Sequence, residues 1–274
     1  MPNQDVPTTN TATAEAATPA PAARRNQWLP TRDLTFADLK HALAAGANDL
    51  RRGGVYSLFF GAFYAAGGFV LAILATRYSV PWLIYPLAMG FVLLAPFAAM
   101  GLYDISQRLE TGQPLSWSGV LGAIRAATKR DMRWMALITG FTFIIWMDIA
   151  ALLTFGFLGL DLNFTDLVNE ILTTPKGILF LVVGNVVGAL IATAVFSFSV
   201  VSFPALYDRD IDFVTAMVTS VKLVARNPAV MAVWALIIGG LVIGSVLTAF
   251  LGLVLALPLL GHATWHLYKR GIPA

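Results

Sequence analysis

Three patterns of polar residues in an otherwise apolar chain have types and spacings that could do chemistry. Asp148, in "FIIWMDIAALL", is the only ionisable residue deep inside a predicted membrane span. His262 and His266 lie four residues apart near the end of the last apolar run, which places both rings on one helix face. The pair Tyr-Asp occurs at Tyr103-Asp104 and Tyr207-Asp208, each time directly after a long apolar run.

Asp148 lies near the middle of its predicted span, where an unpaired carboxylate is costly. An Asp at that depth costs about 2.5–3.5 kcal/mol on insertion scales, so we expect it to face protein or water and not lipid. Asn185 in the next span lies at a similar depth and is a candidate partner. Two interpretations stay open, since Asp148 either belongs to a proton or cation path or is a hydrogen-bonded packing residue.

The histidine pair and the two Tyr-Asp pairs suggest a second candidate site, on the inner face of the membrane. Histidines four apart can chelate a metal ion, but a haem needs ligands on both faces and no third ligand of the Glu-x-x-His type stands nearby. We therefore expect no metal and no cofactor. Either Asp104, Asp208, His262 and His266 converge on one polar site, or they are interfacial anchors and charged stops.

The composition decides what kind of element must position these residues. Of 274 residues, 58% are hydrophobic and 12% are charged, whereas a soluble domain carries about 25% charged residues. The mean hydropathy is +0.74. These values predict an all-α, polytopic transmembrane helical bundle. The chain has no cysteine and no phosphate loop or nucleophile elbow, so we expect that it is not an enzyme.

Six membrane spans are predicted from the apolar runs. Because a span needs about 20 apolar residues, single helices are expected at 55–76, 82–103, 134–158 and 178–203. Residues 228–268 contain no Lys, Arg, Asp or Glu and would make one helix of roughly 60 Å, about twice the hydrocarbon core. We therefore expect two helices there, with a tight reversal around Thr248 to Gly252.

Positive charge sets the predicted orientation. With six spans, sixteen of the 18 Lys and Arg residues lie on one side, and only Arg77 and Lys176 lie on the other. This asymmetry marks the cytoplasmic side, so both termini are expected in the cytoplasm and the net positive charge does not indicate nucleic-acid binding. Lys129, Arg130 and Arg133 are the best candidates for contact with anionic lipid headgroups.

An internal repeat explains why Tyr-Asp recurs. Three units are predicted, at about 35–104, 116–208 and 212–268. Each begins with a capping residue followed by an aromatic one, at Thr35, Ser116 and Asp212. An amphipathic helix and then a transmembrane hairpin follow in every unit. The hairpins end in "PFAAMGLYD", "VVSFPALYD" and "PLLGHATWH", so that Tyr103, Tyr207 and Trp265 correspond.

The amphipathic helices have helical period, and the apolar residues of each share one face on the inner surface. These faces are Phe36, Leu39, Leu43, Ala47 and Leu50; Trp117, Val120, Leu121, Ile124 and Thr128; and Phe213, Met217, Val221 and Val224. Between Gly159 and Gly177 we expect a short helix on the outer surface, with an ordered loop as the alternative. Residues 1–30 are expected to be a disordered Ala/Thr/Pro-rich cytoplasmic tail, and 31–270 to be the membrane domain.

Small residues recur at four-residue spacing inside two of the predicted spans. Gly184 and Gly188 form one such pair, and Gly240 and Gly244 form the other. Pairs of this kind suit close contact between membrane helices. We interpret them as packing features that name no substrate.

Four stretches carry a resemblance to a known family: "DLTFADLKHALAAGANDL", "GLYDISQRLETGQPLSW", "NPAVMAVWAL" and "PLLGHATWHLY". With these the chain resembles, from about Leu34 to Tyr268, a bacterial family of integral membrane proteins called domain-of-unknown-function family 2189. The resemblance implies the bacterial inner membrane. Some members are labelled cytochrome c oxidase subunits, but a catalytic oxidase subunit needs a set of haem and copper histidines, and this chain has only 3 His.

The expected function is that of a non-enzymatic accessory or scaffold protein of a membrane complex, a respiratory one if the family label holds. A small-solute or ion transporter that uses Asp148 is the alternative. The expected partners are the lipid bilayer and another membrane protein complex, and not nucleic acid.

Overall fold

The protein is built from helices joined by short turns. The computed structural model describes residues 28–77, 98–126, 130–159 and 164–273, and contains no strand within them. The helices are α1 (Phe36–Gly53), α2 (Val55–Arg77), α4 (Trp117–Ala126), α5 (Arg130–Leu158), α6 (Phe164–Thr173), α7 (Pro175–Ser199), α8 (Ser202–Asp208), α9 (Phe213–Arg226), α10 (Pro228–Leu247) and α11 (Leu253–Gly271). A further helical segment covers residues 98–111. The all-helical prediction is confirmed for these residues.

The three predicted caps begin three helices. The Thr35 hydroxyl accepts from the Asp38 amide at 3.2 Å, and the Asp38 carboxylate accepts from the Thr35 amide at 2.9 Å. Ser116 and Asp212 accept from the amides three residues on, at 3.1 and 2.9 Å. Because each cap satisfies an amide of the first turn, α1, α4 and α9 begin where the sequence predicts.

Within the described residues, four helices are long and apolar enough to cross a membrane. They are Val55–Leu74, Asp131–Leu158, Pro175–Asp208 and Pro228–Leu247, and they correspond to the first, third, fourth and fifth predicted spans. Most of the predicted span 82–103 lies outside the described residues. The last predicted span is α11, which is not among the candidates, so the count of six stays a prediction.

α10 and α11 are joined by a tight reversal, as expected around Thr248–Gly252. Ala249 and Phe250 there have positive φ of 51° and 67°, a conformation that costs about 1–3 kcal/mol per residue. The Phe250 ring packs on α2 at Gly68, where a Cβ would lie 2.6 Å from it. Since α2 ends at Arg77, the reversal meets α2 nine residues, or about 14 Å, before its end.

The buried faces of α1 and α9 overlap only in part with the predicted apolar faces. α1 buries Leu39, Ala42, Gly46, Asp49 and Gly53, and α9 buries Thr215, Ala216, Thr219, Ser220 and Leu223. Phe36 is 58% exposed and Val221 is 44% exposed, so these two members of the predicted apolar faces are not covered by the described helices. Small side chains allow closer helix packing: a Cβ on Gly46 would lie 2.7 Å from the backbone N of Ala263 in α11. Phe36 and Val221 are left exposed, whereas Leu43 of α1 and Phe213, Met217 and Val224 of α9 are partly buried against the core.

In α4 the predicted apolar face is divided. Val120 is fully buried, whereas Leu121 is 49% exposed, and Thr128 lies outside the described residues. The short helix expected between Gly159 and Gly177 is present as α6. Of the predicted N-terminal tail, residues 1–27 lie outside the described residues.

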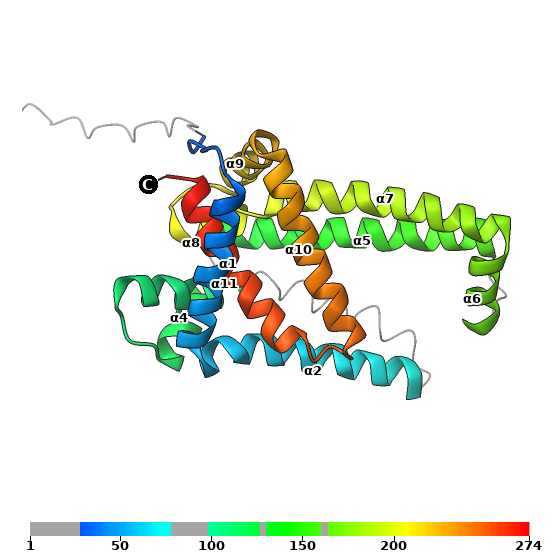
Figure 1. Cartoon of the computed structure of the whole chain (residues 1–274), viewed down its shortest axis with the longest axis horizontal. Helices are drawn as coiled ribbons and strands as arrows, with labels where there is room; N and C mark the ends of the chain where they lie inside the picture. The colour runs from blue at the N-terminus through cyan, green and yellow to red at the C-terminus, as the bar shows by residue number, and fades with distance from the viewer. Residues whose placement is uncertain (1–27, 78–97, 127–129, 160–163, 274) are drawn as a thin grey trace, which may run out of the picture.

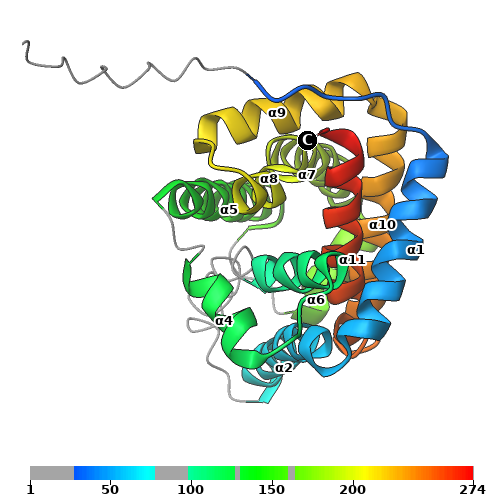
Figure 2. The same ribbon diagram turned by 90° about the vertical axis from the view of Figure 1, so that its left-hand side faces the viewer.

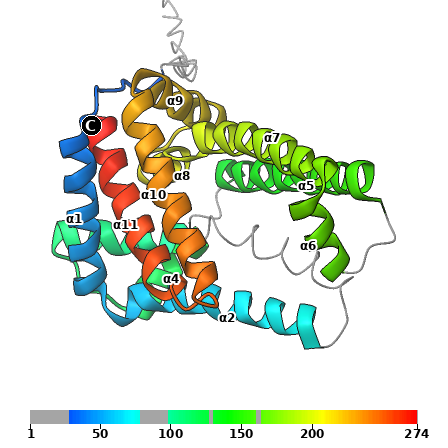
Figure 3. The ribbon, with the colours of Figure 1, turned by 45° about the vertical axis from the view of Figure 1, so that its right-hand side comes forward.

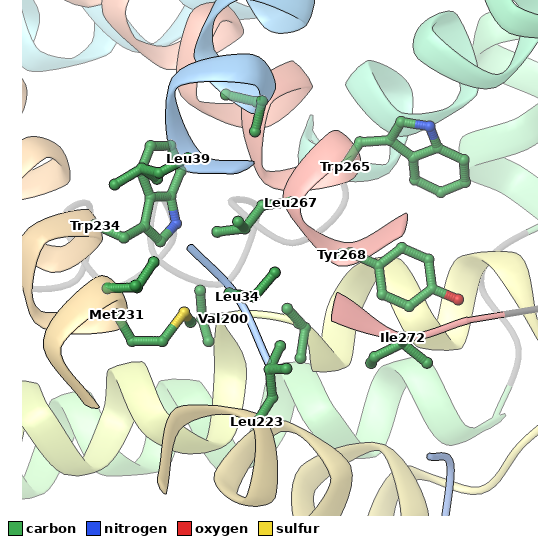
Figure 4. Close-up of a cluster of buried hydrophobic side chains, with 14 of the residues drawn as sticks. Leu34, Leu39, Val200, Leu223, Met231, Trp234, Trp265, Leu267, Tyr268 and Ile272 are labelled. Carbon is green, nitrogen blue, oxygen red and sulfur yellow. The ribbon is translucent and has the colours of Figure 1, made fainter. Parts of the chain in front are cut away.

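The hydrophobic core lies at one end of the molecule, which we call the core end. There α1, α8, α9, α10 and α11 meet (Figure 1), with Trp234, Trp265 and Tyr268 among the buried side chains (Figure 4). Seen toward this end, α1, α4 and α9 lie at the periphery and α11 lies inside them (Figure 2). α5 and α7 run side by side away from it, and 11% and 0% of the residues in their most apolar stretches are buried.

Candidate inner-face polar site

Three aromatic residues from the ends of the predicted repeats meet at the core end. The ring centroid of Trp265 lies 6.0 Å from that of Tyr103 and 5.8 Å from that of Tyr207, and the two tyrosine rings are 6.4 Å apart. These residues come from α11, segment 98–111 and α8. The cluster therefore brings the polar residues that follow each of them into one region.

His262 is buried between two serines. Its Nε2 lies 2.8 Å from the Ser57 hydroxyl on α2, and its Nδ1 lies 2.8 Å from the Ser106 hydroxyl of segment 98–111. All three side chains are 0% exposed. A neutral ring satisfies both contacts if Nδ1–H donates to Ser106 and Nε2 accepts from Ser57. His262 thus joins three helices and has no free ring nitrogen.

His266, one turn further along α11, faces two carboxylates. Its Nε2 lies 2.7 Å from Asp49 of α1, and its Nδ1 lies 3.3 Å from Glu110. The Trp265 indole N–H also donates to Glu110, at 3.2 Å. Burial raises the pKa of Asp49, but hydrogen bonds from His266 and Ser106 outweigh burial and hold this pKa below its ordinary 3.8. Asp49 is therefore an anion near neutral pH.

Asp104 and Asp208 each accept a hydrogen bond from a tyrosine of another helix. Asp104 accepts from the Tyr207 hydroxyl at 2.9 Å and pairs with Arg108 at 2.6 Å. Asp208 accepts from the Tyr268 hydroxyl at 2.7 Å. With both carboxylates occupied by protein donors, each joins two helices at the core end.

The four residues predicted for this site therefore lie near one aromatic cluster, but each has its own protein partners. His262 and His266 contact different groups, and no set of three or more His, Cys, Asp or Glu within the described ranges is arranged to hold a metal ion. The arrangement can order helices and transmit protons along hydrogen bonds. Whether the four residues act as one site stays a prediction.

Sequence reasoning missed Asp49, Ser57, Ser106 and Glu110. For Asp49 a signal exists, because helical spacing places it on the same face as the small residues Ala42 and Gly46. Nothing in the sequence points to Ser57 and Ser106, because their common partner, His262, is distant from both in the chain. Only the packing of α2, segment 98–111 and α11 brings them to His262.

The structure does not bring Asp148 and Asn185 together. Trp146 packs on Gly188 of α7, and Asp148, two residues on, points about 200° away. Asp148 is exposed and has no hydrogen bond or ion pair within the described part of the chain. The Asn185 amide donates to the carbonyl of Leu181 on its own helix at 2.7 Å.

Of the predicted headgroup contacts, only Arg133 has a described side chain. It is exposed near the start of α5. Lys129 lies outside the described residues, and Arg130 is the first residue of α5. Contact of this basic cluster with lipid stays a prediction.

Comparison with known proteins identifies one family. Residues 84–208 match the family model described as "Predicted integral membrane protein (DUF2189)". The match contains the stretch "GLYDISQRLETGQPLSW", so the resemblance inferred from it is confirmed, and it extends from the second predicted span to the end of α8. Neither a curated protein nor a solved structure matches the chain significantly.

Proposed function

We propose that the chain, whose residues 84–208 match a family of predicted integral membrane proteins, is a non-enzymatic accessory or scaffold protein of a membrane complex. Its α5–α7 hairpin docks another membrane protein. One observation carries this proposal: an exposed apolar face of α5 has the unpaired Asp148 at its centre.

This face, which we call the α5 seam, follows a seven-residue spacing. Trp134, Phe141, Asp148 and Phe155 are seven residues apart. Phe141 is 64% exposed, and Leu152, one turn after Asp148, is 72% exposed. A seven-residue repeat keeps side chains on one side of a helix, where a second helix can pack along it at a shallow angle. The α5 seam therefore has the form of a helix-docking surface.

Asp148 makes contact of the α5 seam with lipid alone energetically unfavourable. A carboxylate facing lipid at this depth costs about 2.5–3.5 kcal/mol, and a partner helix that donates a hydrogen bond removes that cost. A single polar residue in an apolar seam also selects the partner and its register. Because Asp148 points away from α7, this placement favours docking over the alternative, transport along an internal path.

We propose the bacterial inner membrane as the location, with both termini in the cytoplasm and six membrane helices in three hairpins. In support, the C-terminus lies at the core end beside α1 and α9 (Figure 1). The basic residues Arg209, Lys269 and Arg270 lie at the same end, as the positive-inside rule expects of a cytoplasmic face. The third hairpin reaches the least far into the membrane. Its reversal packs on α2 at Gly68, nine residues before α2 ends at Arg77.

The contacts of the amphipathic helices support the threefold repeat. α1 packs on α11, and α9 packs on α8. Val120 of α4 packs with Leu102 and Ile105 of segment 98–111. Each amphipathic helix thus lies on the last helix of the preceding unit, and α1 closes the circle by lying on the last helix of the third unit.

Site-specific photocrosslinking in native membranes tests the docking proposal. A photoreactive residue replaces Leu152 on the α5 seam or, as the control, Phe69, which is 53% exposed on α2. We expect a discrete protein adduct from position 152, its loss when Asp148→Leu is added, and no such adduct from position 69. Lipid adducts alone at position 152, or a protein adduct that ignores Asp148→Leu, would refute docking through the seam.

A further inference from the structure

A groove of about 480 Å³ lies between α1, α10 and α11, which run side by side in Figure 3. Leu50 and Arg51 of α1, Gly240 and Gly244 of α10, and Leu255 and Leu259 of α11 are among its lining residues. Ligand pockets in proteins typically measure about 300–1,000 Å³. The groove is therefore large enough for one chain-like ligand.

The floor of the groove is open because of the glycine pair in α10. A Cβ added at Gly240 or at Gly244 would meet no atom within 4 Å. The four-residue spacing predicts close contact with another membrane helix, but neither glycine makes such a contact with another described helix. The floor is left for a ligand.

The polar atoms of the groove walls are already satisfied within α10. The Ser245 hydroxyl donates to the carbonyl of Leu241 at 2.7 Å, and the Thr248 hydroxyl donates to the carbonyl of Ser245 at 3.0 Å. The surface of the groove is consequently apolar, and a hydrocarbon chain is a better occupant for it than water.

One charge stands at the groove. Arg51 is the only charged residue in its lining. It is exposed and has no hydrogen bond or ion pair to any described residue. A guanidinium is well suited to a phosphate, which it binds through paired hydrogen bonds.

The groove also has the depth of a single leaflet. Arg51 lies four residues before the first residue of α2, Val55. The reversal at the other end of the groove reaches α2 at Gly68 through Phe250. Thirteen residues of helix span about 20 Å, which is about half of the 40–45 Å thickness of a bilayer with its headgroup regions.

We propose that this groove binds one anionic phospholipid of the inner-face leaflet. An acyl chain lies along the floor at Gly240 and Gly244, and the phosphate pairs with Arg51. The apolar walls, the unpaired cation and the leaflet depth all require the same ligand: a hydrocarbon chain with a negative headgroup. The site is separate from the α5 seam, so it does not depend on the docking proposal.

Native mass spectrometry of the purified full-length chain tests this proposal. The probes are phosphatidylglycerol and phosphatidylcholine with identical acyl chains. We expect one retained phosphatidylglycerol, bound about fivefold more tightly than phosphatidylcholine, because one Arg near a membrane surface contributes an effect of that size. Arg51→Gln should remove the preference between headgroups, and Gly244→Leu should weaken binding of both lipids.

Two matched variants serve as controls. Arg52→Gln removes the neighbouring charge, and Gly239→Leu adds the same side chain at the other open glycine of α10; both should bind lipid as the wild type does. The proposal is overturned if the wild type shows no headgroup preference, if Arg52→Gln acts like Arg51→Gln, or if Gly244→Leu acts like Gly239→Leu. If Gly244→Leu does not fold by circular dichroism, Gly240→Leu replaces it.

Discussion

The core end and the α5–α7 hairpin differ in how they treat polar side chains. At the core end, polar side chains are buried and paired, as His262 is with Ser57 and Ser106; among the described residues, Nε1 of Trp234 is the one buried side-chain nitrogen or oxygen without a partner. Along the hairpin, large apolar side chains are exposed, and the carboxylate of Asp148 has no partner among the described residues. The polar groups of the core end are satisfied mainly within the chain. In the hairpin, the apolar surface and Asp148 would be satisfied only by a partner that covers them.

Because of this difference, we expect substitutions in one region to change stability and substitutions in the other to change binding. A buried polar group that loses its partner retains its desolvation cost, so substitutions at the core end should lower the free energy of unfolding. An exposed polar group has little to lose within the single chain, so substitutions on the α5 seam should spare folding and remove a partner. Four measurements test this separation.

The largest effect is expected for His262→Ala. It leaves the Ser57 and Ser106 hydroxyls without their partner and opens a cavity among buried helices, which should lower the free energy of unfolding by about 2–4 kcal/mol. His41→Ala is the control, because His41 is exposed on α1 and should change stability by less than about 0.5 kcal/mol. Denaturant unfolding in detergent measures both, and equal effects would contradict a stabilising role for His262.

The second largest effect is expected for a Gly→Ala substitution at the core end, compared with the same substitution in the hairpin. Gly46→Ala places a Cβ 2.7 Å from the backbone of Ala263, so α1 must move off α11 at a cost of about 1–3 kcal/mol. Gly184→Ala in α7 meets no atom within 4 Å and should be neutral or stabilise by up to about 1 kcal/mol, because Ala is the better helix former. A loss of stability in Gly184→Ala that matches Gly46→Ala would mean that the hairpin is as closely packed as the core end.

A smaller effect is expected for the two aspartates. Asp104→Asn weakens the contacts with Tyr207 and Arg108 and should cost about 1–2 kcal/mol. Asp148→Asn should change the stability of the isolated chain by less than about 0.5 kcal/mol. Thermal unfolding of the purified variants compares them, and the two regions would not differ as described if Asp148→Asn were the more damaging change.

The smallest effect concerns acid. Since the pKa of Asp49 is below 3.8 in the folded protein, its ionised form stabilises the fold above the unfolded pKa, and this contribution is lost as the pH falls through the folded pKa. Between pH 6 and pH 3 the unfolding temperature of the wild type should fall more than that of Asp49→Asn. Parallel curves would show that Asp49 contributes nothing to acid sensitivity.

Local signals in the sequence predicted a good part of the fold. The caps at Thr35, Ser116 and Asp212 begin helices, and the reversal lies at Thr248–Gly252. Tyr103, Tyr207 and Trp265, aligned from their neighbours alone, are in contact. Such features depend on the backbone within a few residues or on a repeated pattern, and both are readable in a single chain.

Features that depend on how close two helices approach were not predictable in this way. Hydrophobic periodicity selected the face of Phe36 on α1, but the contact with α11 selected the face of Gly46, because a crossing with direct backbone contact admits only small side chains. The same contact placed Asp49 beside His266. Likewise, equal depth suggested that Asn185 partners Asp148, but the rotation of α5 points Asp148 away from α7, while Asn185 lies beside Trp146 and Ala150 of α5.

The amino-acid sequence alone is enough to predict that this chain is helical, that several helices are apolar enough for a membrane, and where most of them begin and turn. These properties follow from composition, capping chemistry and periodicity, which act locally. Which polar residues are paired and which are left open depends on the tertiary structure. Pairing depends on the rotation and separation of helices distant in the chain, and for His262 and Asp148 that geometry gave opposite results.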